Sequence, residues 1–430
     1  MEEGAIYSAA LVIPAISPPI LDGAVAVKDG KLLFVGPRRE ARELGLGMRE
    51  RHWPGILAPG LVNAHAHLQY TGMERLGKSV WPDFRAWAAA FNDMYEPIEA
   101  SGASPWKDWA ADGARRAALS GTTAIADVVT NWEAASALHD EGLGGIAYWE
   151  VMNETNEEWN ESKETELAKR IRSIPGLAGI SPHSPYSLDR VPLSRLPGIA
   201  KNLGARTHIH LAESPVERET EDPATEFKDW HSFKSKDFSD ARKGGYGGSS
   251  VQYVDKLGVL GPECHIAHGV YLTAADRETL RKRKTAIAFC PRSNRVTGLD
   301  EPPIASCLLE GNLIAAGTDS LSSSPTLDLM DDVAELAILA KKQGYSAKDL
   351  HLRLVHAATL GGAIALGLGS GEGRIGQLGV GARADLAFFD IHVGSGANAI
   401  EDALAELAEG GGGKCACSFI AGIKKFGLLF

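Results

Sequence analysis

The chain has 430 residues, enough for one large domain and a smaller appendage. Its formal net charge of -11, from 55 acidic and 44 basic residues, gives it no overall attraction for nucleic acid or for an anionic membrane. The five cysteines are odd in number and irregularly spaced, so the sequence predicts no disulfide framework and favours a reducing compartment.

The N-terminal stretch argues against export. It opens with Glu2 and Glu3, and prolines at positions 14, 18 and 19 interrupt its apolar run, unlike a signal peptide or a membrane span. We therefore expect a soluble, cytoplasmic protein whose partner is a small-molecule substrate, with no nucleic-acid or membrane partner. A homodimer is compatible with the exposed helices of the fold predicted below.

Both ends of the chain are rich in short predicted strands. Residues 1–58 contain alternating runs between Gly and Pro turns, which indicates a small antiparallel sheet. Residues 366–430 include GQLGVGARADLAFFD, with a predicted strand at residues 384–389. We expect the two ends to form one discontinuous β domain, a small β-sandwich.

The middle of the chain, residues 59–365, alternates strand-like and helix-like runs at the spacing of βα units. Helices are predicted between the strands, for example at residues 106–119 and 327–341. The predicted class is therefore α/β, with a (β/α)8 barrel. The eight predicted strands are LVNAHAH, TTAIADVV, GIAYWEVM, LAGISPHS, ARTHIHLAE, HIAHGVYL, TAIAFCPRS and LIAAGTDS.

Two longer connections stand out in this region. Residues 69–84 follow the first predicted strand, and residues 214–250 follow the fifth. The second connection carries mixed charge and then GGYGGSS, so a mobile lid and a disordered surface insertion are both open interpretations. The glycine run at residues 410–413 and the FGLLF tail suggest no function.

Metal-seeking side chains end several of the predicted barrel strands. The C-terminal ends of barrel strands meet on one face, so residues distant in sequence converge there. His65 and His67 form an H-x-H pair whose imidazoles point to the same side of the strand. A pair of histidines without a metal is the competing interpretation, and the matching residues on later strands disfavour it.

The fifth predicted strand carries a second H-x-H pair, His208 and His210, followed by Glu213. His210 is the favoured ligand because Glu213 lies three residues further on, where the strand turns into its loop. Glu213 is predicted to carry protons between the attacking water and the leaving group, and a helix N-cap is its alternative role. We expect His208 to be packed beside the ligands.

Three further residues end the eighth, sixth and fourth strands: Asp319, His268 and His183. Asp319 can ligate a metal, His268 can orient a water molecule, and His183 is a candidate substrate contact. Three nitrogens and one oxygen suit Zn²⁺, with Fe²⁺ and Mn²⁺ as alternatives. The fourth strand, ISPHSPYS, offers no lysine that could bridge two ions, so we expect one metal.

These motifs together resemble the amidohydrolase superfamily, most closely its deaminase branch. The resemblance rests on PGLVNAHAH, HLAES, SPHSPY, PRSN, GTDS and GQLGVGARADLAFFD. It implies hydrolytic deamination, in which Glu213 protonates a ring nitrogen while Asp319 and His268 hold an activated water against the ring carbon. The metal ligands that it implies are His65, His67, His210 and Asp319, with His183 binding the substrate.

The segment HLQYTGMERLGKSVWPDFRAWAAAFNDMYE is similar to the first loop of aminodeoxyfutalosine deaminases of menaquinone biosynthesis. Their substrate is an adenine nucleoside with a benzoate-like group. Adenosylhomocysteine-type members place a ribose-binding Glu before the Trp of this loop, whereas Ala86 precedes Trp87 here. We predict that Trp87 contacts the substrate and that Gln69 or Glu150 holds a ribose, unless the substrate is not a nucleoside. Candidates for an anionic substrate end are Arg292, Arg85 and Arg295.

Other functions remain open from the sequence. The same residues fit hydrolysis of a ring amide, as in imidazolonepropionase-type enzymes, or deamination of another purine, a pyrimidine or a triazine. A metal-free scaffold that has lost catalysis is a more distant alternative, and the presence of every expected ligand argues against it.

Overall fold

Two β-sheets organise the computed structural model, which describes residues 4–44, 47–217 and 246–427. One sheet has eight parallel strands that follow one another in chain order. The backbone N–H groups of Thr318 and Asp319 donate to the carbonyl of His65 at 3.1 and 3.0 Å, which joins the last strand to the first. The predicted (β/α)8 barrel is therefore confirmed. Its strands are β5 (Leu61–Ala66), β6 (Thr122–Val129), β7 (Gly144–Val151), β8 (Ala178–Pro182), β9 (Thr207–Leu211), β10 (Cys264–His268), β11 (Ala286–Phe289) and β12 (Ile314–Ala316).

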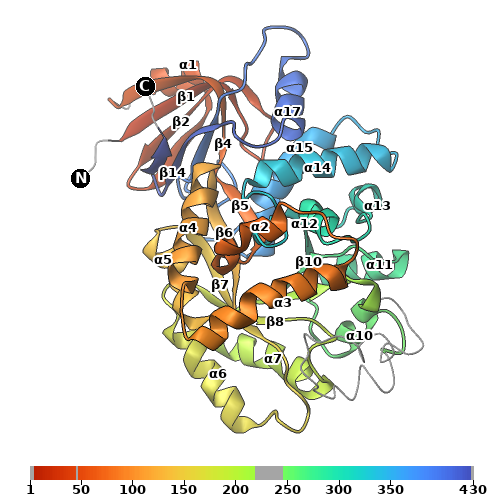
Figure 1. The fold of residues 1–430 in the computed structure, drawn as a ribbon. Coiled ribbons are helices and arrows are strands. Elements are labelled where there is room, and N and C mark those ends of the chain that lie inside the picture. Colours follow the sequence, from red (N-terminus) through yellow and green to blue (C-terminus); the bar gives the residue numbers. More distant parts are fainter. Residues whose placement is uncertain (1–3, 45–46, 218–245, 428–430) are drawn as a thin grey trace.

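Helices surround the barrel (Figure 1). The predicted helix at residues 106–119 coincides with α4, and the one predicted at residues 327–341 corresponds to α14. The longer helices are α3 (Phe84–Ser101), α4 (Trp106–Leu119), α6 (Glu161–Ser173), α7 (Arg190–Leu203), α11 (Ala274–Arg283) and α14 (Leu329–Lys342). The shorter ones are α5 (Ala137–Asp140), α10 (Ser250–Lys256), α12 (Pro291–Val296), α13 (Ile304–Glu310), α15 (Leu350–His356) and α16 (Gly362–Ala365), with the single turns η2 (Trp132–Ala134) and η5 (Ala357–Gly361).

The two long connections differ from the expected loops. The first contains two helical turns: η1 (Leu68–Met73), which packs against α4 and β6, and α2 (Glu74–Gly77), which packs against η1 and α3. In the second connection, the short turn η3 (Pro215–Glu217) comes soon after Glu213, and the next described helix is α10. Residues 218–245, on which the lid interpretation depends, lie outside the described residues.

Strands from both termini form the second sheet, in the order β15-β14-β13-β4-β1-β2-β3. The sheet is mixed because β1 and β4 pair in parallel, whereas a purely antiparallel sheet was expected. The chain runs from β3 through α1 (Arg38–Glu43) before it returns beside β1, and such a crossover is what parallel pairing requires. The strands are β1 (Ala5–Val12), β2 (Ile20–Lys28), β3 (Lys31–Pro37), β4 (Arg49–Pro59), β13 (Leu386–Phe389), β14 (Cys415–Ile420) and β15 (Ile423–Gly427).

This terminal sheet curls around a core of its own. The backbone N–H of Leu32 in β3 donates to the carbonyl of Ala382 at 2.9 Å, which links the β3 edge to the segment before β13. Inside the curl, the ring of Tyr7 lies 5.1 Å from that of Phe419 and 5.8 Å from that of Phe388, between centroids. The discontinuous β domain expected from both termini is thus confirmed, with its strands joined in one rolled sheet.

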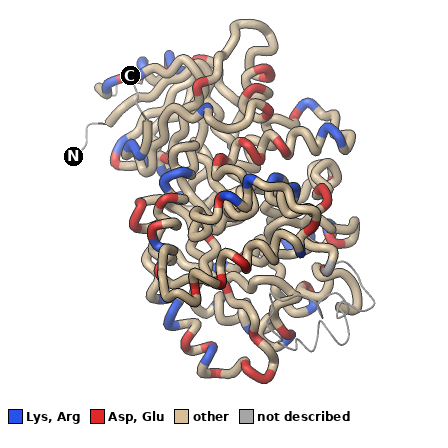
Figure 2. The backbone as a smooth tube through the Cα atoms, in the orientation of Figure 1, with Lys and Arg blue, Asp and Glu red and all other residues tan. Residues whose placement is uncertain are grey.

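The terminal segments also contact the barrel. Helix α17 (Ala399–Glu409), which precedes β14, packs against α14 and α15 (Figure 1). Acidic and basic residues are intermingled along the surface elements (Figure 2), and several pair within one helix, such as Arg116 with Asp112 at 2.8 Å. In the described part of the chain, no helix offers an apolar stretch long enough to cross a membrane.

Candidate active site

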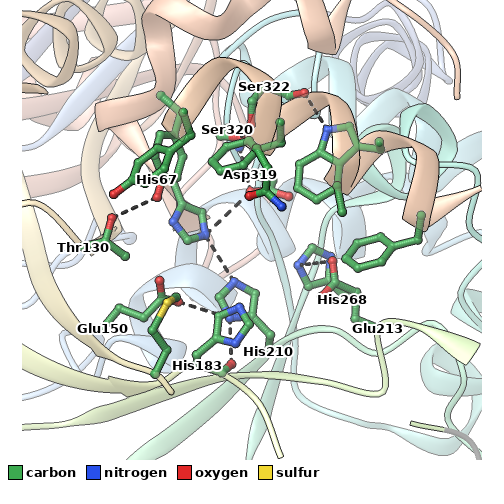
Figure 3. Close-up of a pocket in the computed structure, with 18 of the residues that line it drawn as sticks. His67, Thr130, Glu150, His183, His210, Glu213, His268, Asp319, Ser320 and Ser322 are labelled. Atoms are coloured by element: carbon green, nitrogen blue, oxygen red, sulfur yellow. Dashed lines mark hydrogen bonds and ion pairs between the residues drawn. The ribbon is translucent and has the colours of Figure 1, made fainter. Parts of the chain in front are cut away.

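The C-terminal ends of the barrel strands carry the polar side chains of the candidate site (Figure 3). His65 lies in β5 and His67 directly follows this strand, while His210 lies in β9. His268 is the last residue of β10, and Asp319 follows β12. All five residues are buried. The barrel therefore brings together the residues that the sequence placed on four separate strands.

The backbone turns sharply where these strands become loops. Ala212, His268 and Asp319 have φ angles of 53°, 73° and 58°, in the left-handed region that residues other than glycine adopt uncommonly. Strained residues of this kind cluster at functional sites, where the surrounding structure holds them in place. Here they occur at the ends of β9, β10 and β12, beside or within the candidate site.

Donor atoms of His65, His67 and Asp319 form one group that could hold a metal ion, and His210 joins this group through its proximity to His65 and His67. Nε2 of His67 lies 3.2 Å from Nε2 of His210, and Oδ1 of Asp319 lies 3.6 Å from Nε2 of His65 and 3.9 Å from Nε2 of His67. Ligands bound to a tetrahedral zinc ion lie roughly 3.3 Å apart. Nε2 of His65 is buried with no hydrogen-bond partner among the described residues, as expected of a donor whose partner is an ion. The cluster can therefore hold a divalent metal.

Hydrogen bonds fix the orientation of these ligand groups. Nδ1 of His210 donates to the carbonyl of His183 at 2.9 Å, so its Nε2 keeps a free lone pair that faces the cluster. The hydroxyls of Ser293 and Ser323 donate to Oδ2 of Asp319 at 2.7 and 2.9 Å. Such contacts behind the ligands hold each donor in its binding geometry.

Glu213 and His268 form a pair beside the metal-ligand cluster, with Oε1 of Glu213 3.4 Å from Nε2 of His268. Nδ1 of His268 donates to Oδ1 of Asn294 at 3.1 Å, so the Nε2 lone pair faces Glu213. Burial raises the pKa of Glu213 well above its ordinary value, and the charge of Asp319 raises it further. Burial also lowers the pKa of His268. Both shifts act in the same sense, because they favour the neutral carboxyl of Glu213 and the neutral imidazole of His268.

Glu150 and His183 stand at the same end of the barrel. Burial, together with the neighbouring carboxylates, raises the pKa of Glu150 to about 8. Its Oε1 lies 3.6 Å from Nδ1 of His210 and has no hydrogen-bond partner among the described residues. Burial lowers the pKa of His183 to about 3, and its Nδ1 is engaged by the hydroxyl of Ser187 at 2.7 Å. Both residues line the cavity next to the cluster, where a ligand can reach them.

The cavity has a volume of about 310 Å³ and combines two kinds of lining. Much of its polar lining comes from the strand ends, and much of its aromatic lining comes from α3 through Phe84, Trp87, Phe91 and Tyr95. The indole N–H of Trp87 donates to the carbonyl of Ser322 at 2.9 Å, which anchors the aromatic lining to the loop after β12. A cavity with a few polar groups and flat aromatic faces suits a heteroaromatic ligand.

The sequence matches the amidohydrolase family over residues 56–422, most of the chain. The chain belongs to the amidohydrolase family. It is 30% identical over 413 residues to 5-methylthioadenosine/S-adenosylhomocysteine deaminase of Moorella thermoacetica, in a match that covers 88% of this chain and 84% of that protein. This amidohydrolase is therefore an enzyme, a hydrolase that acts on C–N bonds other than peptide bonds.

Solved structures share the fold of this amidohydrolase. An adenosine deaminase from Xanthomonas campestris with bound zinc superimposes with a TM-score of 0.77 at 24% identity, over 98% of this chain and 93% of that one. The aminofutalosine deaminase of Helicobacter pylori superimposes with a TM-score of 0.78 at 17% identity, over 98% and 99%. At these identities the similarity concerns the fold.

Two predicted substrate contacts of the amidohydrolase do not line the cavity. The side-chain oxygen of Gln69 accepts the backbone N–H groups of Thr130 and Asn131 at 3.2 and 3.1 Å. The guanidinium of Arg292 is buried and donates to Asp332 at 2.7 Å. The expectation that these side chains bind a ribose and an anionic substrate end is therefore not supported, because each is already engaged by the protein.

The other predicted substrate contacts, Trp87, Glu150 and His183, do line the cavity. Sequence reasoning missed the rest of the α3 aromatic face, whose signal is the spacing of three and four residues between its members. It also missed Ser293 and Ser323, which hold Asp319. Ser293 lies within the PRSN motif, but the sequence does not indicate which side chain it contacts.

Proposed function

We propose that this amidohydrolase is a metal-dependent deaminase that replaces the exocyclic amino group of an adenine nucleoside with oxygen and releases ammonia. The observation that carries the proposal is the position of the buried carboxyl of Glu213, 3.4 Å from His268, beside a cluster of histidine and carboxylate donors. The relative from Moorella thermoacetica is named for deaminating two adenine nucleosides, which supports the same reaction here.

The proposed metal is one Zn²⁺ ion, with Fe²⁺ and Mn²⁺ as alternatives. Three imidazole nitrogens and one carboxylate oxygen are a ligand set that zinc favours in catalytic sites. When bound, a divalent ion supplies a water molecule of lowered pKa that can act as a nucleophile at neutral pH. The proposed ligands are His65, His67, His210 and Asp319.

The remaining residues are assigned to proton transfer and orientation. The protonated carboxyl of Glu213 can donate to the ring nitrogen next to the reacting carbon and can then take a proton from the attacking water. His268 and Asp319 are assigned to orienting that water, because both side chains line the same cavity as Glu213. His183, on the cavity lining, is assigned to binding the purine.

For the substrate, we propose aminodeoxyfutalosine, which would place the enzyme in menaquinone biosynthesis. The first-loop segment supports this choice, and a protein of similar fold is the aminofutalosine deaminase of Helicobacter pylori. We assign Trp87 to stacking on a ring and Glu150 to a ribose hydroxyl, because both side chains line the cavity. 5-Methylthioadenosine is the second candidate because the Moorella thermoacetica relative is named for it.

The test is ammonia release by the zinc-loaded enzyme, with metal content measured on the same sample. The panel contains aminodeoxyfutalosine, 5-methylthioadenosine, S-adenosylhomocysteine, adenosine, guanine, cytosine and a triazine. We expect release from an adenine nucleoside, fastest from aminodeoxyfutalosine. The control variant Glu213→Gln should keep its metal and lose at least about 100-fold in kcat, because it removes the proton carrier.

Each other outcome of this test has a distinct meaning. No release from the panel by a metal-loaded enzyme would favour ring-amide hydrolysis of the imidazolonepropionase type. An enzyme that neither binds metal nor releases ammonia would favour the inactive scaffold. Full activity of Glu213→Gln would show that another group moves the proton.

A further inference from the structure

His208 is a buried histidine that the proposed reaction does not use. It lies on β9 two residues before His210, and its side chain is completely inaccessible to solvent. Its Nε2 lies 3.0 Å from Nδ1 of His65, one of the four proposed metal ligands. On its other side, Nδ1 lies 3.3 Å from the hydroxyl oxygen of Ser181 in β8. The three side chains form a continuous line from the barrel wall to the candidate metal site.

The rings of His65 and His208 lie within hydrogen-bond distance of each other. Their planes differ by only 7°, and their centroids lie 4.8 Å apart. The two ring planes are thus nearly parallel, and the nearest nitrogens lie 3.0 Å apart, within the distance of an N–H···N hydrogen bond. In such a bond one imidazole donates its ring proton and the other accepts it with a ring lone pair.

The direction of this hydrogen bond follows from the metal site. Nε2 of His65 is the atom that faces Asp319, at 3.6 Å, and it can bind a metal only through a lone pair. The ring proton of His65 must then sit on Nδ1 and be donated to Nε2 of His208. His208 in turn carries its proton on Nδ1 and donates it to the hydroxyl oxygen of Ser181.

We propose that His208 is a positioning residue that holds His65 in the tautomer and orientation needed for metal binding, with Ser181 fixing the tautomer of His208. The inference rests on the proposed metal-dependent function. The two histidines of the motif on β9 therefore have different roles. His210 is a proposed metal ligand, and His208 acts through His65. Loss of such a supporting contact typically weakens metal binding by 10- to 100-fold.

The neighbouring strand supplies a matched control. His265 on β10 is equally inaccessible to solvent, and its ring centroid lies 4.6 Å from that of His208. Its Nε2 donates to the backbone carbonyl of Ala64 at 3.0 Å and not to a proposed ligand side chain. Replacement of His265 therefore disturbs the same core by a similar amount while leaving the His65–His208 contact in place.

The experiment measures zinc affinity by competition with a chelator, together with the thermal unfolding temperature of each metal-free protein. His208→Phe removes the acceptor for His65, and we expect it to bind zinc 10- to 100-fold more weakly than the wild type. His208→Gln offers its amide oxygen near the position of Nε2, and we expect its affinity within about threefold of the wild type. His265→Phe should lower the unfolding temperature about as much as His208→Phe and leave the zinc affinity unchanged.

Cobalt provides a second readout that does not depend on activity. We expect the visible absorption spectrum of cobalt-loaded His208→Phe to differ from that of the wild type, because His65 is no longer held. The spectrum of His265→Phe should match the wild type. Ser181→Ala, a smaller change that keeps the fold if His208→Phe does not, should weaken zinc binding in the same direction.

Two results would overturn the role of His208. One is a zinc affinity of His208→Phe within about threefold of the wild type, and the other is an equal loss in His265→Phe. The proposed function fails separately. If the wild type deaminates no nucleoside but its zinc affinity depends on His208 as expected, the positioning role stands and the proposed function fails. If the wild type is active and His208→Phe binds zinc as tightly as the wild type, only the positioning role fails.

Discussion

On β6, the carboxyl of Asp127 is buried beneath the helical turn that follows β5. Its Oδ1 accepts the backbone N–H of Leu68 at 2.9 Å, one residue beyond His67. Burial is the main cause of a pKa raised to about 7, and the hydrogen bond from Leu68 opposes it only in part. Asp127 therefore holds the start of η1 through this hydrogen bond, and its burial favours the protonated form of its carboxyl.

This preference predicts a pH dependence of stability. An ordinary aspartate in the unfolded chain is ionised above about pH 4, so the folded state binds more protons than the unfolded state between about pH 4 and pH 7. The free energy of unfolding should thus fall as pH rises through this window, by at most about 1.4 kcal/mol per pH unit from this group. Above pH 7 the contribution of Asp127 no longer changes.

Asp127→Asn provides the measurement. The amide oxygen can still accept the N–H of Leu68 but does not titrate, so thermal unfolding of the variant should depend less on pH between pH 5 and pH 7. Wild type and variant share every other titrating group, and the difference between their two pH profiles isolates Asp127. Identical profiles would contradict a raised pKa at this position.

At the scale of elements, α3 gives the cavity its aromatic character. Asp83 caps its N-terminus by accepting the N–H of Ala86 at 2.8 Å, and Gly102, with φ of 69°, ends it. Between these ends the aromatic residues repeat on one face and pack on one another, with Phe91 and Tyr95 nearly parallel at 5.6 Å between centroids. The helix is therefore a fixed surface onto which a flat ligand can stack.

Removal of one aromatic ring from this surface should weaken substrate binding. We predict that Trp87→Ala raises KM for the preferred nucleoside at least fivefold, since stacking of a base on an aromatic side chain contributes about 1–3 kcal/mol. Zinc content should stay unchanged because Trp87 is not a proposed ligand. Met94→Ala on the same helix is the control, because Met94 packs against the core and does not line the cavity. A KM of Trp87→Ala within twofold of that of Met94→Ala would exclude the stacking role.

The site was predictable from the sequence where local pattern decides position. Alternation along a strand places His65 and His67 on one side, and the convergence of strand ends supplies the rest of the cluster. The ion pair between Arg292 and Asp332 was not predictable, because Asp332 lies forty positions further along the chain, in α14. The turns η1 and α2 were also missed, because they are held by contacts with other elements, η1 by α4 and α2 by η1 and α3, rather than by their own short sequence.

At the scale of the whole molecule, the two sheets were predictable as units, but their internal arrangement was not. The parallel pairing of β1 with β4 depends on how the chain crosses over after β3. The curl of the terminal sheet depends on contacts between Tyr7 and residues near the other end of the chain, Phe388 and Phe419. Short strand sequences carry no information on such distant partners.

The junction between the two sheets is the single residue Gly60, which lies between the end of β4 and the start of β5. Its N–H donates to the carbonyl of Asp385, from the C-terminal part of the small domain, at 2.9 Å. A Cβ at this position would lie 2.2 Å from the hydroxyl oxygen of Thr123 on β6 and 2.8 Å from the Cβ of Thr123. Only glycine therefore allows β5 to leave the small domain this close to β6, and His65 lies five residues further along.

This close approach predicts that Gly60→Ala is destabilising, because a methyl group must displace the buried side chain of Thr123. We expect a loss of about 1–3 kcal/mol, seen as a lower thermal unfolding temperature. The second substitution Thr123→Ala, made in the same variant, removes the two nearest atoms but leaves the Cβ, so it should restore part of the loss and not all of it.

Gly198→Ala in α7 is the control. No atom lies within 4 Å of its added Cβ, and alanine favours a helix over glycine, so this variant should unfold at or above the wild-type temperature. Equal unfolding temperatures for Gly60→Ala and Gly198→Ala would show that β5 and β6 can separate without cost, and that Gly60 does not fix the position of the strand that carries His65.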